Sequence, residues 1–442
     1  MRRLALPLAL ATTLLALPAA SQQGKTPPVN LYIDVATHNM AGMPDMGGMM
    51  GGMMGGFMAR RMGGGEAAKP TYPTTRNGGM SGQYLDIALH NALKPGVQAQ
   101  ESIPAGLNLG KSLTLIPIEP SPRSSGDSAP GKVPDVEVKI TEYWGCGAAI
   151  RPGQPKVASF KVKGSNKPVD PRNPMGGMQG IDVESSGSLS RGLYAPDRDI
   201  DLQPGYVYWP NRQYGKQVPN GARLAGNHQI SGDGIPASMQ FEVQQAADFM
   251  PRLALHSQGE ATEAVYLNWP SVERARAYFI TGMKMRMLGQ NAFQLVIWSS
   301  AEVPGAGSGV HSYLAGSTLD KWLKLKVLLP STATSCLIPK GIFAGGGSGG
   351  SGGEGDMVPA MLMMTAYGPE NWITYPPRPA DPKQPWKPEW SVRLRAKSTA
   401  TAMLGLDFGS MQQGDDGAGQ PSRPAQKRPG MKGLLHGILG GG

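Results

Sequence analysis

Charged residues and catalytic motifs are both scarce in this sequence. Asp, Glu, Lys and Arg make up 17% of its 442 residues, whereas about a quarter is usual in a globular protein. The basic residues do not form an Arg/Lys stripe with aromatic residues between them, so a formal charge of +10 does not indicate nucleic-acid binding. A complete phosphate-binding loop, nucleophile elbow or HExxH motif is also missing. We therefore predict a protein without catalytic activity.

Long apolar runs are missing after the N-terminus, which argues against a membrane-spanning helix in the mature chain. A short basic segment precedes an apolar run at 4–17, and small residues follow. This run is shorter than the roughly 20 residues that a spanning helix needs. The order is typical of a secretory signal peptide, here 1–21, cut near Ala20 or Ser21. We expect an exported protein in the periplasm, outside the cell or associated with the outer envelope.

Cysteine occurs only twice, as Cys146 and Cys336. The two residues are far apart and form no CxxC pair, which argues against a zinc site or a thioredoxin-like centre. In an oxidising compartment a single disulfide is the natural interpretation. Two independent buried thiols are the alternative.

Glycine and proline are abundant, with 62 and 40 residues, and predict many turns. Between these turns, short segments alternate apolar and polar residues, the period of a half-buried strand. A helix is predicted at 317–329, with Ser317 as its N-cap, and an irregular excursion at 170–225. Strands are predicted at 31–37, 84–91, 112–118, 135–145, 157–162, 237–245, 264–272, 277–285, 293–302, 360–368 and 390–404.

The pattern of short strands and turn-rich connections predicts a mainly β protein with two antiparallel β-sandwich-like domains. The domains should be followed by a disordered Gly-rich tail and preceded by a low-complexity segment with too few aliphatic residues for a core. The predicted divisions are the Met/Gly-rich segment 22–82, the domains 83–250 and 251–404, and the tail 405–442.

The stretch AVYLNWPSVERARAYFI at 264–280 resembles the start of a fibronectin type III-like domain. The resemblance implies that residues 264–404 form such a sandwich. It also implies that Trp269 fills the space between two sheets and that Tyr278 packs on the facing strand. The positions that carry the pattern are Leu267, Trp269, Val272, Ala275 and Tyr278.

More of the chain is similar to an uncharacterised family of exported bacterial Met/Gly-rich proteins. Besides the Met/Gly-rich segment, the similarity rests on YWGCG at 143–147, RPGQP at 151–155, YGPE at 367–370 and the proline-rich run at 375–393. It implies an exported, β-rich protein, and it implies no particular activity.

Methionines crowd the segment MAGMPDMGGMMGGMMGGFMARRM at 40–62. Thioether sulfur is soft and uncharged, so an MxxM spacing suits Cu(I) or Ag(I). The alternatives are an inert or associative repeat and a membrane or partner contact through closely spaced small residues. Without metal or partner the segment should be mobile, because glycine returns no buried area for the entropy lost on ordering. The candidate metal ligands are His38, Met40, Met43, Met46, Met49, Met50, Met53 and Met54.

The acidic run DRDID at 197–201 lacks the glycine and distal glutamate of an EF-hand and is interpreted as a solvated loop. Together these observations predict an exported, non-catalytic binding or assembly protein of the cell envelope. Its partner would be an envelope protein, a lipid surface or a polysaccharide. The alternative function is periplasmic copper or silver handling through the Met-rich segment.

Overall fold

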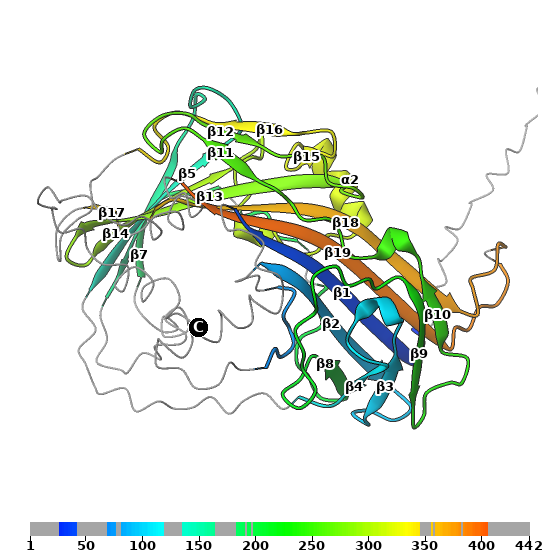
Figure 1. The fold of residues 1–442 in the computed structure, drawn as a ribbon. Helices are drawn as coiled ribbons and strands as arrows, with labels where there is room; N and C mark the ends of the chain where they lie inside the picture. The colour runs from blue at the N-terminus through cyan, green and yellow to red at the C-terminus, as the bar shows by residue number, and fades with distance from the viewer. Residues whose placement is uncertain are drawn as a thin grey trace, which may run out of the picture.

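The structure, a computed structural model, describes residues 26–41, 69–76, 81–118, 135–163, 183–190, 192–195, 198–344, 355–356, 359–381 and 383–404. In these ranges the chain consists largely of β-strands with one α-helix (Figure 1), which confirms the predicted mainly β class. No helix in these ranges is long and apolar enough to cross a membrane. The predicted signal peptide, most of the Met/Gly-rich segment and the predicted tail lie outside them.

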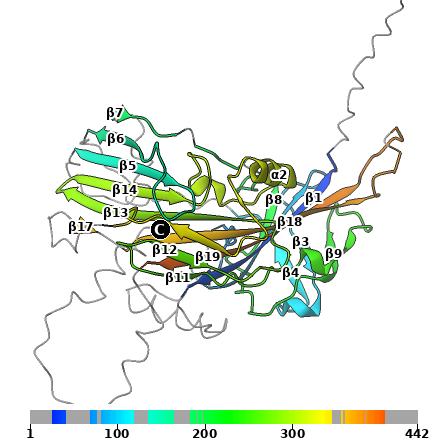
Figure 2. The ribbon, with the colours of Figure 1, turned by 90° about the horizontal axis from the view of Figure 1, so that it is seen from above.

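Twelve strands form one large sheet. Ten of them follow the order β7-β6-β5-β14-β13-β18-β19-β1-β2-β8, and β15 and β17 also pair with β13 (Figures 1 and 2). The strands are β1 (Val29–Met40), β2 (Gly82–Asn91), β5 (Val136–Trp144), β6 (Lys156–Val162), β7 (Val183–Gly187), β8 (Tyr206–Trp209), β13 (Ala277–Gly289), β14 (Ala292–Ser299), β15 (Leu329–Pro330), β17 (Gly355–Asp356), β18 (Met361–Tyr375) and β19 (Trp390–Met403).

The large sheet is mixed, which differs from the antiparallel pairing predicted. Strand β1 runs parallel to β19, and β14 runs parallel to β5, while the other pairs are antiparallel. Strands from the predicted regions 83–250 and 251–404 share this sheet with β1, which comes from the predicted low-complexity segment. The strand predicted at 31–37 is present and longer than expected.

Two smaller sheets pack on one face of the large sheet and enclose the main core with it. In Figure 1 the four-stranded sheet lies near β1, β2 and β8, and the three-stranded sheet lies near β13 and β5. The first consists of β3 (Ala99–Ser102), β4 (Ser112–Leu115), β9 (Gly226–Gly232) and β10 (Gln240–Val243), and the second of β11 (His256–Gln258), β12 (Val265–Asn268) and β16 (Ser335–Ile338).

The opposite face of the large sheet is polar and is buried along β1 and β19. Side chains alternate between the faces of a strand. Leu31, Ile33 and Val35 of β1 therefore enter the apolar core, whereas Asp34 between them points to the other face and is only 4% exposed. In β19 the polar face carries Arg393, Arg395 and Lys397, all buried. Three connecting segments cover these charges.

The one described α-helix, α2 (Gly316–Lys324), covers another part of the polar face. Its Leu319 and Trp322 pack with Phe279 of β13 and Tyr367 of β18. The predicted N-cap is wrong, because Ala315 occupies that position and makes no side-chain cap. The helix is also shorter than predicted, since residues after Lys324 turn back to form β15. Short 3-10 turns occur at Ala105–Leu107, Gln245–Ala247 and Ser308–Val310.

The residues of the fibronectin-like pattern lie in β12, in β13 and in the turn between these strands. Trp269 is 3% exposed, and its ring centroid lies 5.7 Å from that of Tyr278 in an edge-on contact. The backbone N–H of Val272 donates to the Tyr278 hydroxyl at 3.0 Å. The pattern therefore organises this turn, while the family resemblance itself stays a prediction.

The two cysteines are at disulfide-bonding distance. Cys146 follows β5 of the large sheet, Cys336 lies in β16 of the three-stranded sheet, and their Cα atoms are 5.3 Å apart. The bond closes a loop of 190 residues. It links the large sheet covalently to a sheet that packs on its apolar face.

We expect removal of this bond to destabilise the protein. In the chain-entropy model, removal of a disulfide that closes a loop of this length lowers the free energy of unfolding by up to about 5 kcal/mol. Urea unfolding of a Cys146→Ala, Cys336→Ala variant measures the change, and reduction of the unaltered protein should reproduce it. Two freely alkylated thiols in the native protein would contradict the prediction.

Candidate functional site

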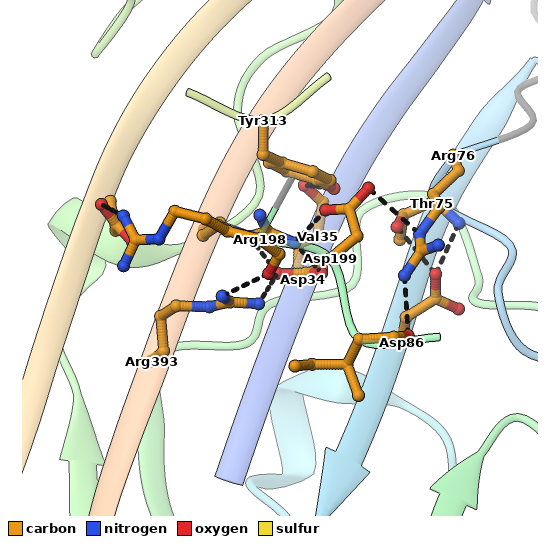
Figure 3. A network of polar contacts seen from close by, with 12 residues as sticks. Asp34, Val35, Thr75, Arg76, Asp86, Arg198, Asp199, Tyr313 and Arg393 are labelled. Carbon is orange, nitrogen blue, oxygen red and sulfur yellow. Dashed lines mark hydrogen bonds and ion pairs between the residues drawn. The ribbon is translucent and has the colours of Figure 1, made fainter. Parts of the chain in front are cut away.

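A buried ion network lies at the centre of the polar face, where β1 meets β19. Arg395 Nε donates to Asp34 Oδ1 at 2.7 Å, and Arg395 Nη2 donates to Asp34 Oδ2 at 2.5 Å. Figure 3 shows Asp34 within this network. The two residues are register partners on parallel strands. Burial alone would raise the pKa of Asp34, but the charges of Arg395 and Arg393 outweigh it and hold this pKa below its usual range.

The segment 198–201 covers this pair and adds further charges. Asp199 Oδ1 accepts a second bond from Arg395 Nη2 at 2.7 Å, and the Arg198 carbonyl accepts from Arg393 Nη1 at 2.7 Å. Asp201 binds Arg76 from another covering segment at 2.6 Å. The acidic run is therefore not simply a solvated loop, because Asp199 is largely buried in the network and only the side chain of Asp201 is well exposed.

The segment 74–76 is anchored by Asp86 of β2. The carboxylate of Asp86 accepts the backbone N–H and hydroxyl groups of Thr74 and Thr75 at 2.7–2.9 Å. Asp86 lies opposite Asp34 in the β1–β2 register. Burial raises the pKa of Asp86, although the hydrogen bonds from both threonines oppose this shift. These bonds hold Arg76 beside Asp199, as Figure 3 shows, and within ion-pair distance of Asp201.

Lys397 lies further along β19, under a third covering segment that contains His311 and Tyr313. Its Nζ lies 3.4 Å from the His311 carbonyl and 4.6 Å from the centroid of the Tyr313 ring. Burial, reinforced by the nearby Arg395, lowers the pKa of Lys397 to about 8. The Tyr313 hydroxyl donates to the Val35 carbonyl at 2.9 Å. This contact fixes the covering segment on β1.

Both ring nitrogens of His311 are engaged, Nδ1 with Thr365 Oγ1 at 2.7 Å and Nε2 with Thr281 Oγ1 at 2.8 Å. Burial, together with the charge of Lys397, lowers the pKa of this histidine to about 3. The imidazole is therefore neutral at physiological pH. Its neutral side chain therefore bonds the covering segment to both β13 and β18.

A cleft lies on the other side of the sheet, away from this network. It has a volume of about 380 Å³ and meets β1 only at Thr37, whose hydroxyl donates to the Met250 carbonyl. Arg274 spans its wall and donates to the carbonyls of Gln245, Asp248 and Phe249. The lining residues include no serine, cysteine, histidine or lysine, so the cleft does not pair a nucleophile with a histidine or lysine base.

Of the predicted metal ligands, the structure describes His38 and Met40. Both point to the polar face of β1, and His38 Nδ1 makes a short contact with Thr399 Oγ1. Burial, together with the charge of Lys397, lowers the pKa of His38 to about 3. Met43, Met46, Met49, Met50, Met53 and Met54 lie outside the described residues. Within those residues, no three His, Cys, Asp or Glu side chains are grouped as for a metal ion.

The three covering segments do not extend over the other end of this face, where β6, β5, β14, β13, β18 and β19 meet. Apolar side chains here are half-buried or exposed, with Met283, Met285 and Met361 between 37% and 39% exposed. We call this surface the methionine face. It comprises Val138, Ile140, Phe160, Met283, Met285, Met287, Phe293, Leu295, Ile297, Met361, Met363 and Met403.

No protein-family model, curated protein or solved structure matches the chain. The functional argument therefore rests on the chain's own residues. Sequence reasoning predicted the strands that carry both the ion network and the methionine face. It missed the network because alternating charges in β19 indicate a solvated face, and the three covering segments come from distant irregular stretches. An aspartate inside the apolar run LYIDVAT was the available signal.

Loss of the Asp34 charge should be far more costly than loss of an exposed carboxylate. In an Asp34→Asn variant the buried Arg395 loses its principal counter-charge, which should lower the free energy of unfolding by about 3–5 kcal/mol. The matched control is Glu263→Gln, because Glu263 pairs with Lys340 where both side chains are more than half exposed. It should cost less than about 1 kcal/mol. Equal losses in urea unfolding would show that the network is not a structural requirement.

The stability of the protein should rise between pH 8 and pH 10. Folded Lys397 releases its proton near pH 8, whereas its ordinary pKa is 10.5, so the unfolded chain binds more protons in this window. The rise should reach up to about 1.4 kcal/mol per pH unit. Tyrosines such as Tyr313, whose pKa burial raises, oppose it above pH 10, because their phenols ionise in the unfolded chain.

Urea unfolding at successive pH values measures this rise in three proteins. A Lys397→Met variant should show a flat profile between pH 8 and pH 10. A Lys340→Met control should keep the rise, because that side chain is 63% exposed. A rise of equal size in the Lys397→Met variant would contradict the assignment to Lys397.

Proposed function

We propose that this chain is an exported, non-catalytic binding or assembly protein of the cell envelope, which works by docking on a lipid surface. Export is supported by the signal-like N-terminal residues and by two cysteines at bonding distance. The absence of catalysis is supported by the ion network, in which the central charged groups are engaged with one another beneath covering segments. The observation that carries the binding function is the methionine face.

The methionine face is too extensive to be scattered surface hydrophobicity. Its members are register neighbours on six consecutive strands, so they form one continuous patch. Contiguous exposed apolar patches mark interaction sites, because single exposed apolar residues are common but large patches are rare in monomers. The disulfide follows β5 directly and ties this half of the sheet to the three-stranded sheet. The part of the large sheet that carries the methionine face is therefore covalently linked to a second sheet.

Two features favour a lipid surface as the occupant. First, the rows of the face contain few charged groups, namely Glu142 and Lys156, and Glu142 is already bound by the backbone N–H groups of Ser190 and Gly305. A surface with so few polar anchors suits hydrocarbon better than a protein, whose interfaces carry about one hydrogen bond per 100–200 Å². Second, the mature chain, without Arg2 and Arg3 of the signal peptide, keeps a net charge of about +8, and anionic headgroups attract basic proteins.

Copper or silver handling through the Met-rich segment stays the alternative function. Most of its predicted ligands lie outside the described residues, and His38 is engaged with Thr399 in the folded sheet. The described part of the chain has further methionines on the methionine face, where they lie on paired strands and not in a low-complexity segment.

Vesicle flotation tests the proposed function. The purified chain should float with vesicles that contain phosphatidylglycerol and less with pure phosphatidylcholine, and binding should weaken as salt screens the charges. A Met285→Glu, Leu295→Glu variant places two carboxylates on the face and should reduce partitioning at least roughly tenfold, since a charge is costly to bring into hydrocarbon. A Leu93→Glu, Tyr266→Glu control changes the net charge equally at exposed positions elsewhere and should keep partitioning within about twofold.

If the methionine face binds something other than lipid, the flotation test gives a different result. If the chain ignores both kinds of vesicle but forms a dimer in solution that the Met285→Glu, Leu295→Glu variant disrupts, the face binds a second copy and the lipid proposal is wrong. If the two double variants float equally well, the face is not the contact surface. Circular dichroism of each variant confirms that the β-rich fold is retained.

A further inference from the structure

Three methionines form a single row across the methionine face. In the register of the sheet, Met283 of β13 lies opposite Met361 of β18, and Met361 lies opposite Met403 of β19. Both pairs are antiparallel, so neighbouring Cβ atoms in the row lie about 4.5–5.5 Å apart and all three side chains leave the same face. Met283 and Met361 are 38% and 37% exposed, and Met403 is half-buried. A solvent-borne ion can therefore reach the row.

The geometry allows three thioethers to converge on one ion. A methionine side chain is unbranched and has three flexible bonds, so its sulfur can move several ångströms without disturbing the backbone. Met285 of β13 stands diagonally next to Met361, and Met363 lies two residues further along β18 on the same face, so either can supply a further sulfur. The strands fix the positions from which the sulfurs start, so little backbone order has to be created on binding.

The chemistry of this row selects a narrow class of ion. Thioether sulfur is soft and carries no charge, so it binds soft monovalent ions. Mg²⁺ and Ca²⁺ prefer oxygen ligands, and Zn²⁺ prefers thiolate or imidazole ligands, none of which this row of methionines supplies. The carboxylate nearest in the row, Glu142, is separated from Met283 by Ile297 and is bound to backbone N–H groups. Hard ligands therefore do not compete at the row itself.

We propose that Met283, Met361 and Met403 form a binding site for a soft monovalent ion, Cu(I) or Ag(I), on the folded sheet. This site goes beyond docking on lipid, because it depends on sulfur and not on apolar area. It is also distinct from the Met-rich segment. The ion is bound without a change of oxidation state.

Substitution by leucine separates the two roles of these residues. Leucine matches methionine in volume and keeps the face apolar, but it has no sulfur. The row variant carries Met283→Leu, Met361→Leu and Met403→Leu. The matched control changes three buried methionines away from the face, Met239→Leu, Met250→Leu and Met364→Leu. A third variant changes Met43, Met46, Met49, Met50, Met53 and Met54 to leucine.

Two measurements are made on each full chain. Cu(I) is titrated against a chromogenic Cu(I) chelator without oxygen, which reports stoichiometry and affinity. Ag(I) is added to protein labelled with ¹³C at the methionine methyl groups, which reports the individual ligands by NMR. The row variant should bind one ion fewer per chain than the control, whether or not the segment methionines are also changed. The methyl resonances of Met283, Met361 and Met403 should shift together with Ag(I).

Equal stoichiometry in the row variant and the control would overturn the proposal. So would Ag(I) shifts that are confined to methionines of the segment 40–62. The lipid proposal can fail independently, since the row variant should float with anionic vesicles as well as the unaltered chain does. Conversely, a chain that binds the ion at the row but floats with neither kind of vesicle would refute the lipid proposal alone.

Discussion

The parallel pairing of β1 with β19 is the constraint on which the rest of the structure depends. It joins residues that are 361 positions apart in the chain, through twelve register pairs of which Asp34–Arg395 is one. On one side of this junction β1 pairs with β2, which pairs with β8. On the other side β19 pairs with β18, and the remaining strands of the sheet follow. Without this one junction the large sheet would separate into two parts, and the two smaller sheets would no longer share a core.

The charges at this junction also fix its register. Because side chains alternate along a strand, a slip by one residue would place Asp34 in the apolar core and Ile33 or Val35 on the polar face. A buried ion pair contributes little net stability over a well-packed apolar pair, but a misplaced one is very costly. The network therefore favours one pairing among several that β propensity alone would allow. It also positions the covering segments, because Asp199, Thr75 and Tyr313 each bond to or beside this junction.

The sequence predicted the long strands well and the assembly of the strands poorly. Alternation along LYIDVAT and WSVRLRAK indicates β1 and β19, and the aromatic spacing of Trp269 and Tyr278 indicates the turn that joins β12 to β13. Short strands such as β3, β8 and β9 were missed, because four to seven residues with polar neighbours give little periodic signal. Pairing between strands hundreds of residues apart depends on tertiary packing, which local patterns do not encode.

The candidate site was hidden for the same reason. Charged residues at alternate positions of β19 indicate a solvated face, and only the contacts of Asp34, Asp199 and Tyr313 show that it is buried. Soft-metal binding by the Met-rich segment was one of three alternatives, because methionines adjacent in sequence are visible there. The row of Met283, Met361 and Met403 spans 121 positions in sequence and becomes visible only from the registers of β13, β18 and β19.

The contrast between the two ends of this face bears on what the methionines do. Where segments cover the face, β13 and β18 carry Ala277, Phe279, Thr365 and Tyr367, which pack or bond to those segments. Where the face is open, β13, β18 and β19 carry methionine in place of the β-branched residues that strands prefer. An apolar docking surface requires only apolar area, which valine, isoleucine or leucine would provide with better strand propensity. Methionine adds adaptable shape and a soft sulfur atom. Its concentration on three adjacent open strands is therefore better explained by a role that uses one of these two properties than by folding.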